Sequence, residues 1–283
     1  MEFLAVVTVL IVIQVWGHGA VIQRDDWVDS TYRRLQAVKD HRWRLAILIL
    51  LPVVAVILVD GLLTGVLFGL PLLLFYIAVL LYALGRGDFT SELDLYVAAW
   101  QRGDLESAYE HACQLEDFDG SASMHNAAEL HEQVRRAIFY EGFERWFVVV
   151  FWFVLLGPAA ALLYRLCKIM DSRIGSDASE QSLLDQMVFY IEWLPARSLA
   201  LTFAIVGDFE RGIQAVAPVA VDASPAGEVL HVTGSAVLSG DIGAAISEQQ
   251  FTEQAEAELR SAQKILSRSV FCWLVFLALL QLM

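Results

Sequence analysis

Long apolar runs without charged residues constrain this chain more than any other feature of its sequence. Residues 45–84 contain one charged residue, Asp60, and are otherwise dominated by aliphatic and aromatic side chains. A helix needs roughly 20 apolar residues to cross the hydrocarbon core of a bilayer, so this stretch is long enough for two crossings. The pattern predicts membrane helices over 45–59 and 62–84, joined by a tight turn near Asp60 and Gly61.

Three further apolar runs extend this pattern along the chain. Residues 3–22 lack the preceding positive charge of a signal peptide and are predicted to form an uncleaved membrane helix. Residues 146–166 predict a span kinked at Gly157 and Pro158, and residues 270–283 a short C-terminal membrane segment. The fold class expected is all-α: a polytopic membrane helix bundle of about four to six membrane segments with helical soluble insertions.

Residues 187–206 have the length of a membrane span but are ambiguous, because Glu192, Pro195 and Arg197 interrupt them. Charged groups at membrane depth are costly and usually face protein or a water-filled cavity. A re-entrant segment and a span that faces the bundle interior both fit this pattern. The side of the membrane on which the C-terminus lies therefore stays open.

Charge and cysteine content exclude several classes of protein. The net charge of −14 argues against a nucleic-acid partner, which requires a basic surface. The three cysteines, Cys113, Cys167 and Cys272, lack the spacing of a disulfide framework or a zinc site. Phosphate-loop, dinucleotide-binding, zinc-protease and nucleophile-elbow motifs are absent from the sequence, so neither a metal site nor a cofactor is expected.

The distribution of basic residues predicts the topology. The segment 17–44 carries Arg24, Arg33, Arg34, Lys39, Arg42 and Arg44, and the positive-inside rule places it in the cytoplasm. Two spans later, the acidic segment 85–145 is predicted to be cytoplasmic as well. The resulting division is 1–84 (N-terminal membrane helices), 85–145 (acidic helical region), 146–209 (a central span and the ambiguous segment), 210–269 (a soluble helical region) and 270–283 (the C-terminal membrane segment).

Helical periodicity is clear in parts of the soluble regions. Apolar spacing predicts a helix over 91–100, and Gly103-Asp104 reads as a helix stop followed by the N-cap of a second helix over 105–112. A loop is expected at 119–121 and a helix over 129–144. Residues 248–268 predict an amphipathic helix that leads into the last apolar run, with acidic residues early and basic residues late.

Three groups of polar residues lie beside or within the apolar runs. The first is Glu192, Trp193 and Arg197, followed by Asp208. A polar ligand pocket fits it as well as an internal ion pair or an arginine that reaches the lipid headgroups. In the second group, Tyr164, Lys168, Asp171 and Ser172 follow the span 146–166, where a basic membrane anchor is favoured over a pocket. The third group, Glu141 and Arg145, fits ordinary interfacial residues.

Taken together, these motifs resemble the AmpE branch of the CobD/CbiB superfamily of membrane proteins. The resemblance is firm over residues 140–210 and weak over the last 70 residues. The residues that carry it are Glu141, Arg145, Phe151-Trp152, Leu156-Gly157-Pro158, Tyr164-Arg165, Asp171-Ser172, Gly175, Glu192 to Arg197, and Gly207 to Phe209.

The resemblance implies a multi-pass protein of the bacterial inner membrane that senses or transmits a signal in β-lactamase induction and peptidoglycan recycling. Its expected partners are membrane lipid, a cytosolic or membrane protein of cell-wall recycling and a muropeptide-type ligand, and a homo-oligomer is compatible with it. The residues predicted to bind the ligand are Glu141, Arg145, Tyr164, Lys168, Asp171, Ser172, Glu192, Trp193, Arg197 and Asp208.

The wider superfamily includes an amide-forming enzyme of cobalamin synthesis, and this chain departs from the enzyme's pattern. Lys168 replaces an Asn, Val188 and Phe189 stand where the enzyme has a pair of acids, and Glu192 replaces a second Asn. Paired acids could hold magnesium for phosphoryl transfer, so their loss favours binding over catalysis. A membrane-bound enzyme of this type is the alternative, and a solute transporter is a third reading supported only by Glu192 and Arg197.

Overall fold

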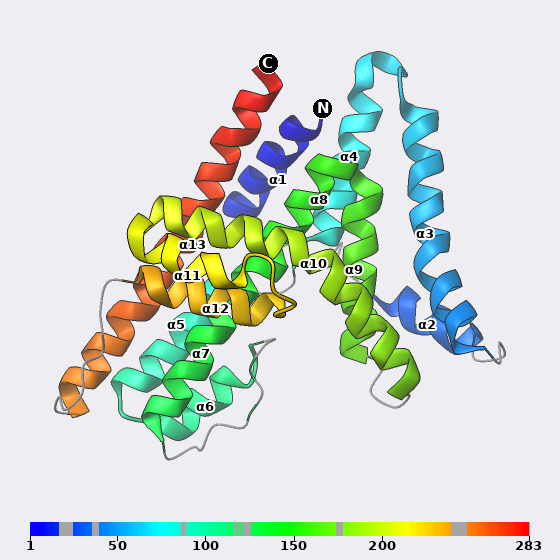
Figure 1. Ribbon diagram of the computed structural model, residues 1–283. Helices are drawn as coiled ribbons and strands as arrows, with labels where there is room; N and C mark the ends of the chain where they lie inside the picture. The colour runs from blue at the N-terminus through cyan, green and yellow to red at the C-terminus, as the bar shows by residue number, and fades with distance from the viewer. Residues whose placement is uncertain are drawn as a thin grey trace. The chain divides into compact units, whose positions relative to one another are not determined.

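A computed structural model describes residues 1–16, 25–35, 40–85, 89–115, 118, 120, 126–173, 178–238 and 248–282. Within these ranges the chain is helical and contains no strand, which confirms the predicted all-α class. The helices divide into two compact units (Figure 1). Unit 1 comprises residues 1–87 and 145–192, and unit 2 comprises residues 88–144 and 193–283.

Unit 1 is built mainly from apolar helices. They pack around a core that joins Leu48 and Ile49 to Leu166, Cys167 and Val188. The outer face of α3 leaves large aliphatic side chains exposed, including Leu51, Leu58 and Leu62. The helices of this unit are α1 (Glu2–Trp16), α2 (Asp26–Leu35), α3 (His41–Leu63), α4 (Leu70–Ala83), α8 (Val148–Leu156), α9 (Pro158–Arg173) and the first half of α10 (Ala178–Val206).

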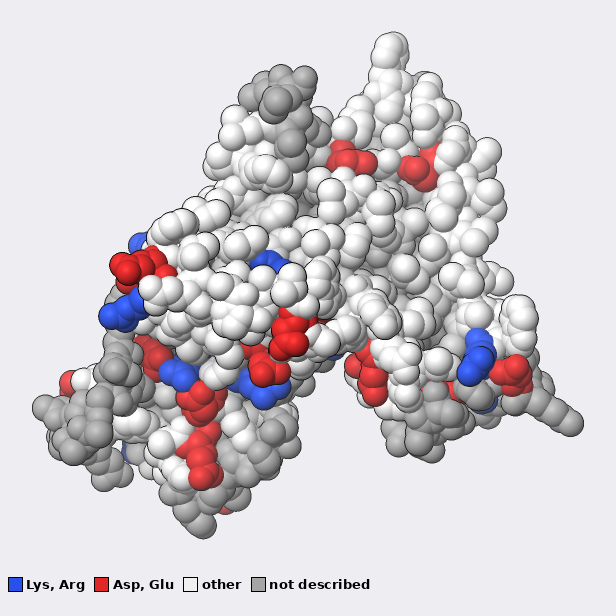
Figure 2. Space-filling view, in the orientation of Figure 1, with Lys and Arg blue, Asp and Glu red and all other residues white. Residues whose placement is uncertain are grey.

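The distribution of charge on unit 1 agrees with insertion into a membrane. Figure 2 shows the surface over α3 and α4 largely uncharged, with two small acidic patches toward the end away from α2, and with Lys and Arg visible only near the end where α2 lies. Among the described residues, three helical segments are long and apolar enough to cross a bilayer: Arg42–Leu63, Glu180–Val206 and Phe251–Leu279. Two shorter apolar segments, Glu2–Ile13 and Leu70–Ala83, accompany them.

The turn between the first two predicted spans lies later than the sequence suggested. Helix α3 continues through Asp60 and Gly61 to Leu63, where both the amide and the hydroxyl of Thr64 donate to the Asp60 carbonyl. The chain then reverses through Gly65 and Gly69, both of which have positive φ. The predicted turn at Asp60-Gly61 is therefore wrong, because positive φ is nearly free of cost at these later glycines.

The predicted single span over 146–166 is also wrong. Helix α8 ends at Leu156, and Gly157 adopts φ 83° and ψ −173°, a conformation accessible essentially only to glycine. Helix α9 then packs back against α8, so that the two form an antiparallel hairpin (Figure 1). Before α8, a π-helical turn at Phe143–Phe147 connects it to helix α7 of unit 2.

Unit 2 contains the acidic region and the C-terminal third of the chain. Its helices are α5 (Phe89–Gln101), α6 (Leu105–Ala112), α7 (Ala127–Gly142), the second half of α10, α11 (Phe209–Val219), α12 (Ala226–Val237) and α13 (Glu248–Leu282). The predicted helices over 91–100 and 105–112 are confirmed as α5 and α6. Asp104 is the N-cap of α6, accepting a hydrogen bond from the Ser107 amide at 3.1 Å.

Other expectations for this region need adjustment. Helix α13 is continuous, so the predicted amphipathic helix over 248–268 and the apolar run over 270–283 belong to one element. Residues 210–238, where the sequence pattern was weak, form α11 and α12. Residues 119 and 121 of the predicted loop, Arg24, Lys39 and Gly175 lie outside the described residues.

Candidate functional site

The predicted site residue Tyr164 on α9 meets Glu192 on α10 inside unit 1. The Tyr164 hydroxyl donates to Glu192 Oε1 at 2.8 Å, and both side chains are buried. A buried carboxylate needs hydrogen-bond donors, because removing it from water is otherwise costly. The adjacent turn of α10 is held by Trp152 of α8, whose indole nitrogen donates to the Ile191 carbonyl at 3.1 Å.

Nearer the surface, the same two helices meet again through polar side chains. The Gln181 amide donates to Asp171 at 2.7 Å and to Asp185 at 3.0 Å. Burial raises the pKa of the Asp171 carboxyl, the Lys168 ammonium partly offsets this, and the neighbouring Asp185 raises the pKa further. Two carboxyl groups and one ammonium group therefore lie together at this end of the contact.

These contacts form one line along the α9–α10 interface, which we call the polar seam. Residues 164, 168 and 171 share one face of α9, and residues 181, 185 and 192 share one face of α10. Tyr164 and Glu192 at one end of the line are buried, whereas Asp171 and Gln181 at the other end are half-buried and Asp185 is exposed. The polar seam comprises Tyr164, Lys168, Asp171, Gln181, Asp185 and Glu192.

Sequence reasoning missed Gln181 and Asp185. Both precede the apolar part of α10 and look like ordinary solvated residues when read alone. The sequence did offer one signal: Gln181, Asp185 and Glu192 have the spacing of residues on one face of a helix. It became informative only once α9 was known to run antiparallel beside this half of α10, as the paired contacts 164 to 192 and 171 to 181 show.

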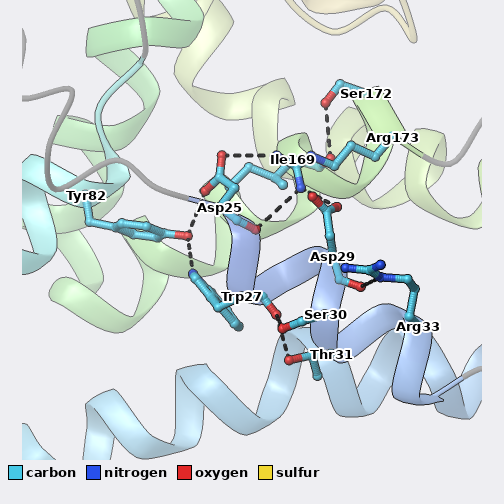
Figure 3. A network of polar contacts seen from close by, with 10 residues as sticks. All are labelled: Asp25, Trp27, Asp29, Ser30, Thr31, Arg33, Tyr82, Ile169, Ser172 and Arg173. Atoms are coloured by element: carbon cyan, nitrogen blue, oxygen red, sulfur yellow. Dashed lines mark hydrogen bonds and ion pairs between the residues drawn. The ribbon is translucent and has the colours of Figure 1, made fainter.

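Ser172 and the following Arg173 make polar contacts outside the polar seam. The Ser172 hydroxyl donates to the Ile169 carbonyl of its own helix at 3.1 Å. Arg173 forms ion pairs with Asp25 and Asp29, which fasten α2 to the end of α9 (Figure 3). Tyr82 of α4 extends this network by donating to Asp25 at 3.1 Å.

A second contact holds α2 and α3 to the start of α10. Arg44 pairs with Glu180 at 2.9 Å, and the Tyr32 hydroxyl donates to the other oxygen of the same carboxylate at 3.1 Å. The Arg44 guanidinium also lies over the Tyr32 ring, 5.7 Å from its centre. The Glu180 side chain is fully buried, so Arg44 and Tyr32 replace part of the hydration that its carboxylate loses.

Arg197 binds backbone carbonyls within unit 2. Its guanidinium donates to the carbonyls of Trp193 at 3.2 Å, Asp222 at 2.7 Å and Ser224 at 3.0 Å. It also stacks on the Trp193 ring at 4.5 Å, and Trp193 donates to the Asp222 carbonyl. Because Arg197 is only 6% exposed, the reading in which it reaches the lipid headgroups is wrong. The structure gives it the role of holding the connection between α11 and α12.

The remaining predicted residues occupy separate places. Asp208 is the N-cap of α11, accepting from the Arg211 amide at 3.1 Å. Glu141 is fully buried in unit 2, and Arg145 is buried in unit 1, where its carbonyl accepts from the Gly85 amide at 2.9 Å. A ligand-binding role for these residues, and for Trp193 and Arg197, stays a prediction.

Unit 2 contains a charged network that sequence reasoning did not identify. Glu258 of α13 binds His131 at 2.7 Å and Arg135 at 2.6 Å, both on α7. Arg135 also pairs with Glu132, which contacts His231 of α12 at 2.9 Å. The network therefore ties α7 to both α12 and α13. Among the described residues, no group of three or more His, Cys, Asp or Glu side chains is placed to hold a metal ion.

Comparisons with known proteins agree with the motifs. The family model described as "Regulatory signalling modulator protein AmpE" matches residues 1–237. Protein AmpE of Shigella flexneri is 22% identical over 222 residues, which cover 76% of this chain and 78% of that protein. Cobalamin biosynthesis protein CobD of Chromobacterium violaceum is 30% identical over 149 residues, only 48% of this chain and 44% of that protein. No solved structure matches. With three apolar helices in its described part that are long enough to span a bilayer, this chain is a membrane protein and belongs to the AmpE family.

Proposed function

We propose that this protein is an inner-membrane signalling protein linked to β-lactamase induction and peptidoglycan recycling. In this proposal the polar seam binds a polar ligand, or a partner protein, rather than catalysing a reaction. The regulatory role in the family description supports the signalling part of the proposal. The link to β-lactamase comes from the family resemblance and is what the experiment below tests.

The ligand-binding part of the proposal depends on one observation: Glu192 is buried, at the inner end of the polar seam. A carboxylate inside an apolar helix bundle is costly, and such residues usually mark a functional site. Tyr164 donates one hydrogen bond to it, and the exposed Asp185 lies two turns earlier on the same face of α10. Carboxylates accept hydrogen bonds from amine and hydroxyl groups, and a muropeptide-type fragment provides both.

The surroundings of the polar seam favour binding over catalysis. Val188, which stands where the cobalamin enzymes carry an acid, packs in the apolar core of unit 1. An aliphatic side chain cannot hold magnesium, which prefers oxygen ligands. The proposed role therefore needs recognition and a conformational response, without phosphoryl transfer.

The direct test is deletion of the gene followed by complementation. Inducible β-lactamase activity and muropeptide pools would be measured with the wild-type gene, with Glu192→Gln and with Asp185→Asn. We expect deletion to change both readouts and the two variants to restore them only partly. Gln186→Ala, an exposed change on the same helix, is the matched control and should restore both. The proposal fails if deletion leaves induction and muropeptide pools unchanged.

A second candidate is a membrane-bound amide-forming enzyme, favoured by the similarity to CobD. It predicts that the purified protein binds ATP with Mg²⁺ in detergent and that Asp171→Asn and Asp185→Asn weaken this binding. Calorimetry with ATP and Mg²⁺ distinguishes the two candidates. A flat titration would count against the enzyme and leave the signalling proposal standing.

A further inference from the structure

The second half of α10 and helix α11 carry an apolar surface that the rest of unit 2 leaves uncovered. Leu194, Leu201 and Ile205 recur at helical spacing on α10, and Phe209 and Ile213 continue the pattern on α11. These five side chains, which we call the apolar strip, are between 39% and 65% exposed. A stripe of this kind on neighbouring helices indicates a surface that contacts something other than water.

The residues of the apolar strip lie on one side of the α10–α11 hairpin. The two helices are joined by a short turn at Gly207 and Asp208, and Gly212 of α11 packs directly on Ala204 of α10. At 100° per residue, the strip residues of α10 lie about a quarter turn around the helix axis from Ala204. The strip residues of α11 lie about a quarter turn, in the same sense, from Gly212. The two helices face each other and run in opposite directions. A quarter turn in the same sense about each axis, viewed from the N-terminus of each helix, therefore brings both sets of strip residues to the same side of the hairpin.

Helix α11 has the three sectors of a helix that lies at a membrane surface. Gly212 and Val216 are buried against the rest of unit 2. Phe209 and Ile213 form the exposed apolar sector, and Glu210, Arg211 and Gln214 form an exposed polar sector beyond it. An interfacial helix buries its apolar face at the boundary of headgroups and acyl chains and keeps its polar face in water.

A contact with helix α13 shows where along that helix the α10–α11 hairpin lies. Its last apolar run begins at Val270, and Trp273 near the start of that run donates to Thr202 of α10 at 2.9 Å. Tryptophan is enriched at the membrane–water boundary. The preceding turns of α13 expose Lys264 and Arg268, which suit the anionic headgroups of a phospholipid surface.

The direction of α10 is also informative. Figure 1 shows the second half of α10 crossing α13 within unit 2 rather than running alongside it. If the apolar end of α13 enters the bilayer, a helix that crosses it at the level of Trp273 lies close to the membrane plane. Length and composition alone would equally allow α10 to span the membrane.

We propose that the apolar strip is a lipid contact: the second half of α10 and all of α11 lie in the surface of the bilayer, at the leaflet marked by Lys264 and Arg268. Residues 193–219 then form an interfacial hairpin and not a membrane crossing. The apolar end of α13 is the segment of unit 2 that enters the bilayer. This inference is independent of the proposed function, because it depends only on the membrane location of the protein.

The test uses the full chain with its cysteines replaced by Cys113→Ser, Cys167→Ala and Cys272→Ala. Single cysteines introduced by Leu201→Cys, Phe209→Cys and Ile213→Cys would carry a bimane fluorophore after reconstitution into phosphatidylethanolamine–phosphatidylglycerol vesicles. The vesicles contain lipids with a nitroxide placed either near the headgroup or near the end of the acyl chain. We expect all three labels to be quenched roughly twofold more by the shallow nitroxide than by the deep one, as an interfacial position requires.

Two controls bracket this result. A label at Leu279→Cys, on the apolar end of α13, should be quenched more by the deep nitroxide. A label at Gln214→Cys, on the polar sector of α11, should respond to aqueous iodide and only weakly to either lipid.

Three outcomes would overturn the inference. Strong quenching of the strip labels by iodide would place the strip in water. Depth that increases steadily in a further series through Leu194→Cys, Leu201→Cys and Ile205→Cys would make α10 a crossing helix. Protection from lipid and iodide together, with cysteine crosslinks between molecules, would identify the occupant as a second copy of the chain.

Discussion

Tyr164 illustrates at the scale of one residue how a polar side chain selects the partner of an otherwise apolar helix. Apolar faces in a membrane pack with little preference, because lipid is as apolar as leucine. The hydrogen bond from Tyr164 to Glu192 is directional and can form only when α9 and α10 meet at one level. It therefore contributes to the register of the two helices as well as to the candidate site.

Tyr164→Phe should destabilise the folded protein by about 1–3 kcal/mol, because it removes a donor from a buried carboxylate. Unfolding by sodium dodecyl sulfate in mixed micelles would measure the change. Glu192→Gln and the double variant complete a mutant cycle. A coupling free energy near zero would show that the two side chains do not depend on each other.

His231 provides a pH-dependent contribution to unit 2. Burial lowers the pKa of its imidazole, the Glu132 carboxylate partly opposes this, and Arg135 and Arg136 lower the pKa further. At pH values just below the ordinary histidine pKa, His231 is therefore less protonated in the folded state than in the unfolded state. Stability should therefore fall as the pH drops below about 6.5.

Glu132 acts in the same direction at lower pH. Burial works to raise its pKa, but the hydrogen bond from Arg135 and the neighbouring positive charges outweigh this and lower it. Melting temperatures between pH 8 and pH 5 should show that His231→Gln flattens the first part of the decline. An unchanged pH profile in this variant would contradict the assignment to His231.

At the scale of elements, local signals predicted some boundaries well and others poorly. The stop at Gly103, the cap at Asp104 and the helices on either side were predictable, because each signal lies within a few residues of the boundary it sets. The reversals after α3 and α8 were not. Gly61, Gly65, Gly69 and Gly157 look alike in the sequence, yet Gly61 is helical and the other three have positive φ.

Gly157→Ala should therefore destabilise the α8–α9 hairpin by about 1–3 kcal/mol, because its backbone conformation is strained for any other residue. Gly61→Ala is the matched control, since this helical glycine has open space where a Cβ would lie. It should be neutral or slightly stabilising. Monodisperse yield in detergent and melting temperature would compare the two, and equal losses would argue against backbone strain as the cause.

The Arg44–Glu180 and Asp29–Arg173 ion pairs should differ in strength. Glu180→Ala leaves Arg44 without its carboxylate in a largely buried setting and should cost about 3–5 kcal/mol. Asp29→Ala removes the exposed partner of Arg173 and should cost at most about 1 kcal/mol. Unfolding in mixed micelles measures both. Equal losses would mean that burial does not separate the two contacts.

At the scale of the whole molecule, the acidic region of unit 2 is expected on the cytoplasmic side of the membrane. The basic segment 17–44 and the two predicted crossings that follow it support this topology. Cys113, the native cysteine at the end of α6, is exposed and reports on it directly.

A membrane-impermeant maleimide should label Cys113 in inside-out vesicles and not in intact spheroplasts. Cys167, which is buried, should stay unlabelled in both preparations. Cys113→Ser identifies the signal that belongs to this residue. Labelling of Cys113 from outside the cell would reverse the predicted topology.

The sequence by itself determined the helical class, the membrane character and the family, because periodicity, apolar run length and motif residues are local properties of the chain. It also marked Tyr164, Asp171 and Glu192 as residues of interest. Only the tertiary structure decided that α8 and α9 form a hairpin, that Gln181 and Asp185 join the polar seam and that Arg197 holds backbone carbonyls. These features depend on contacts between residues far apart in sequence, whose pairing local composition does not specify.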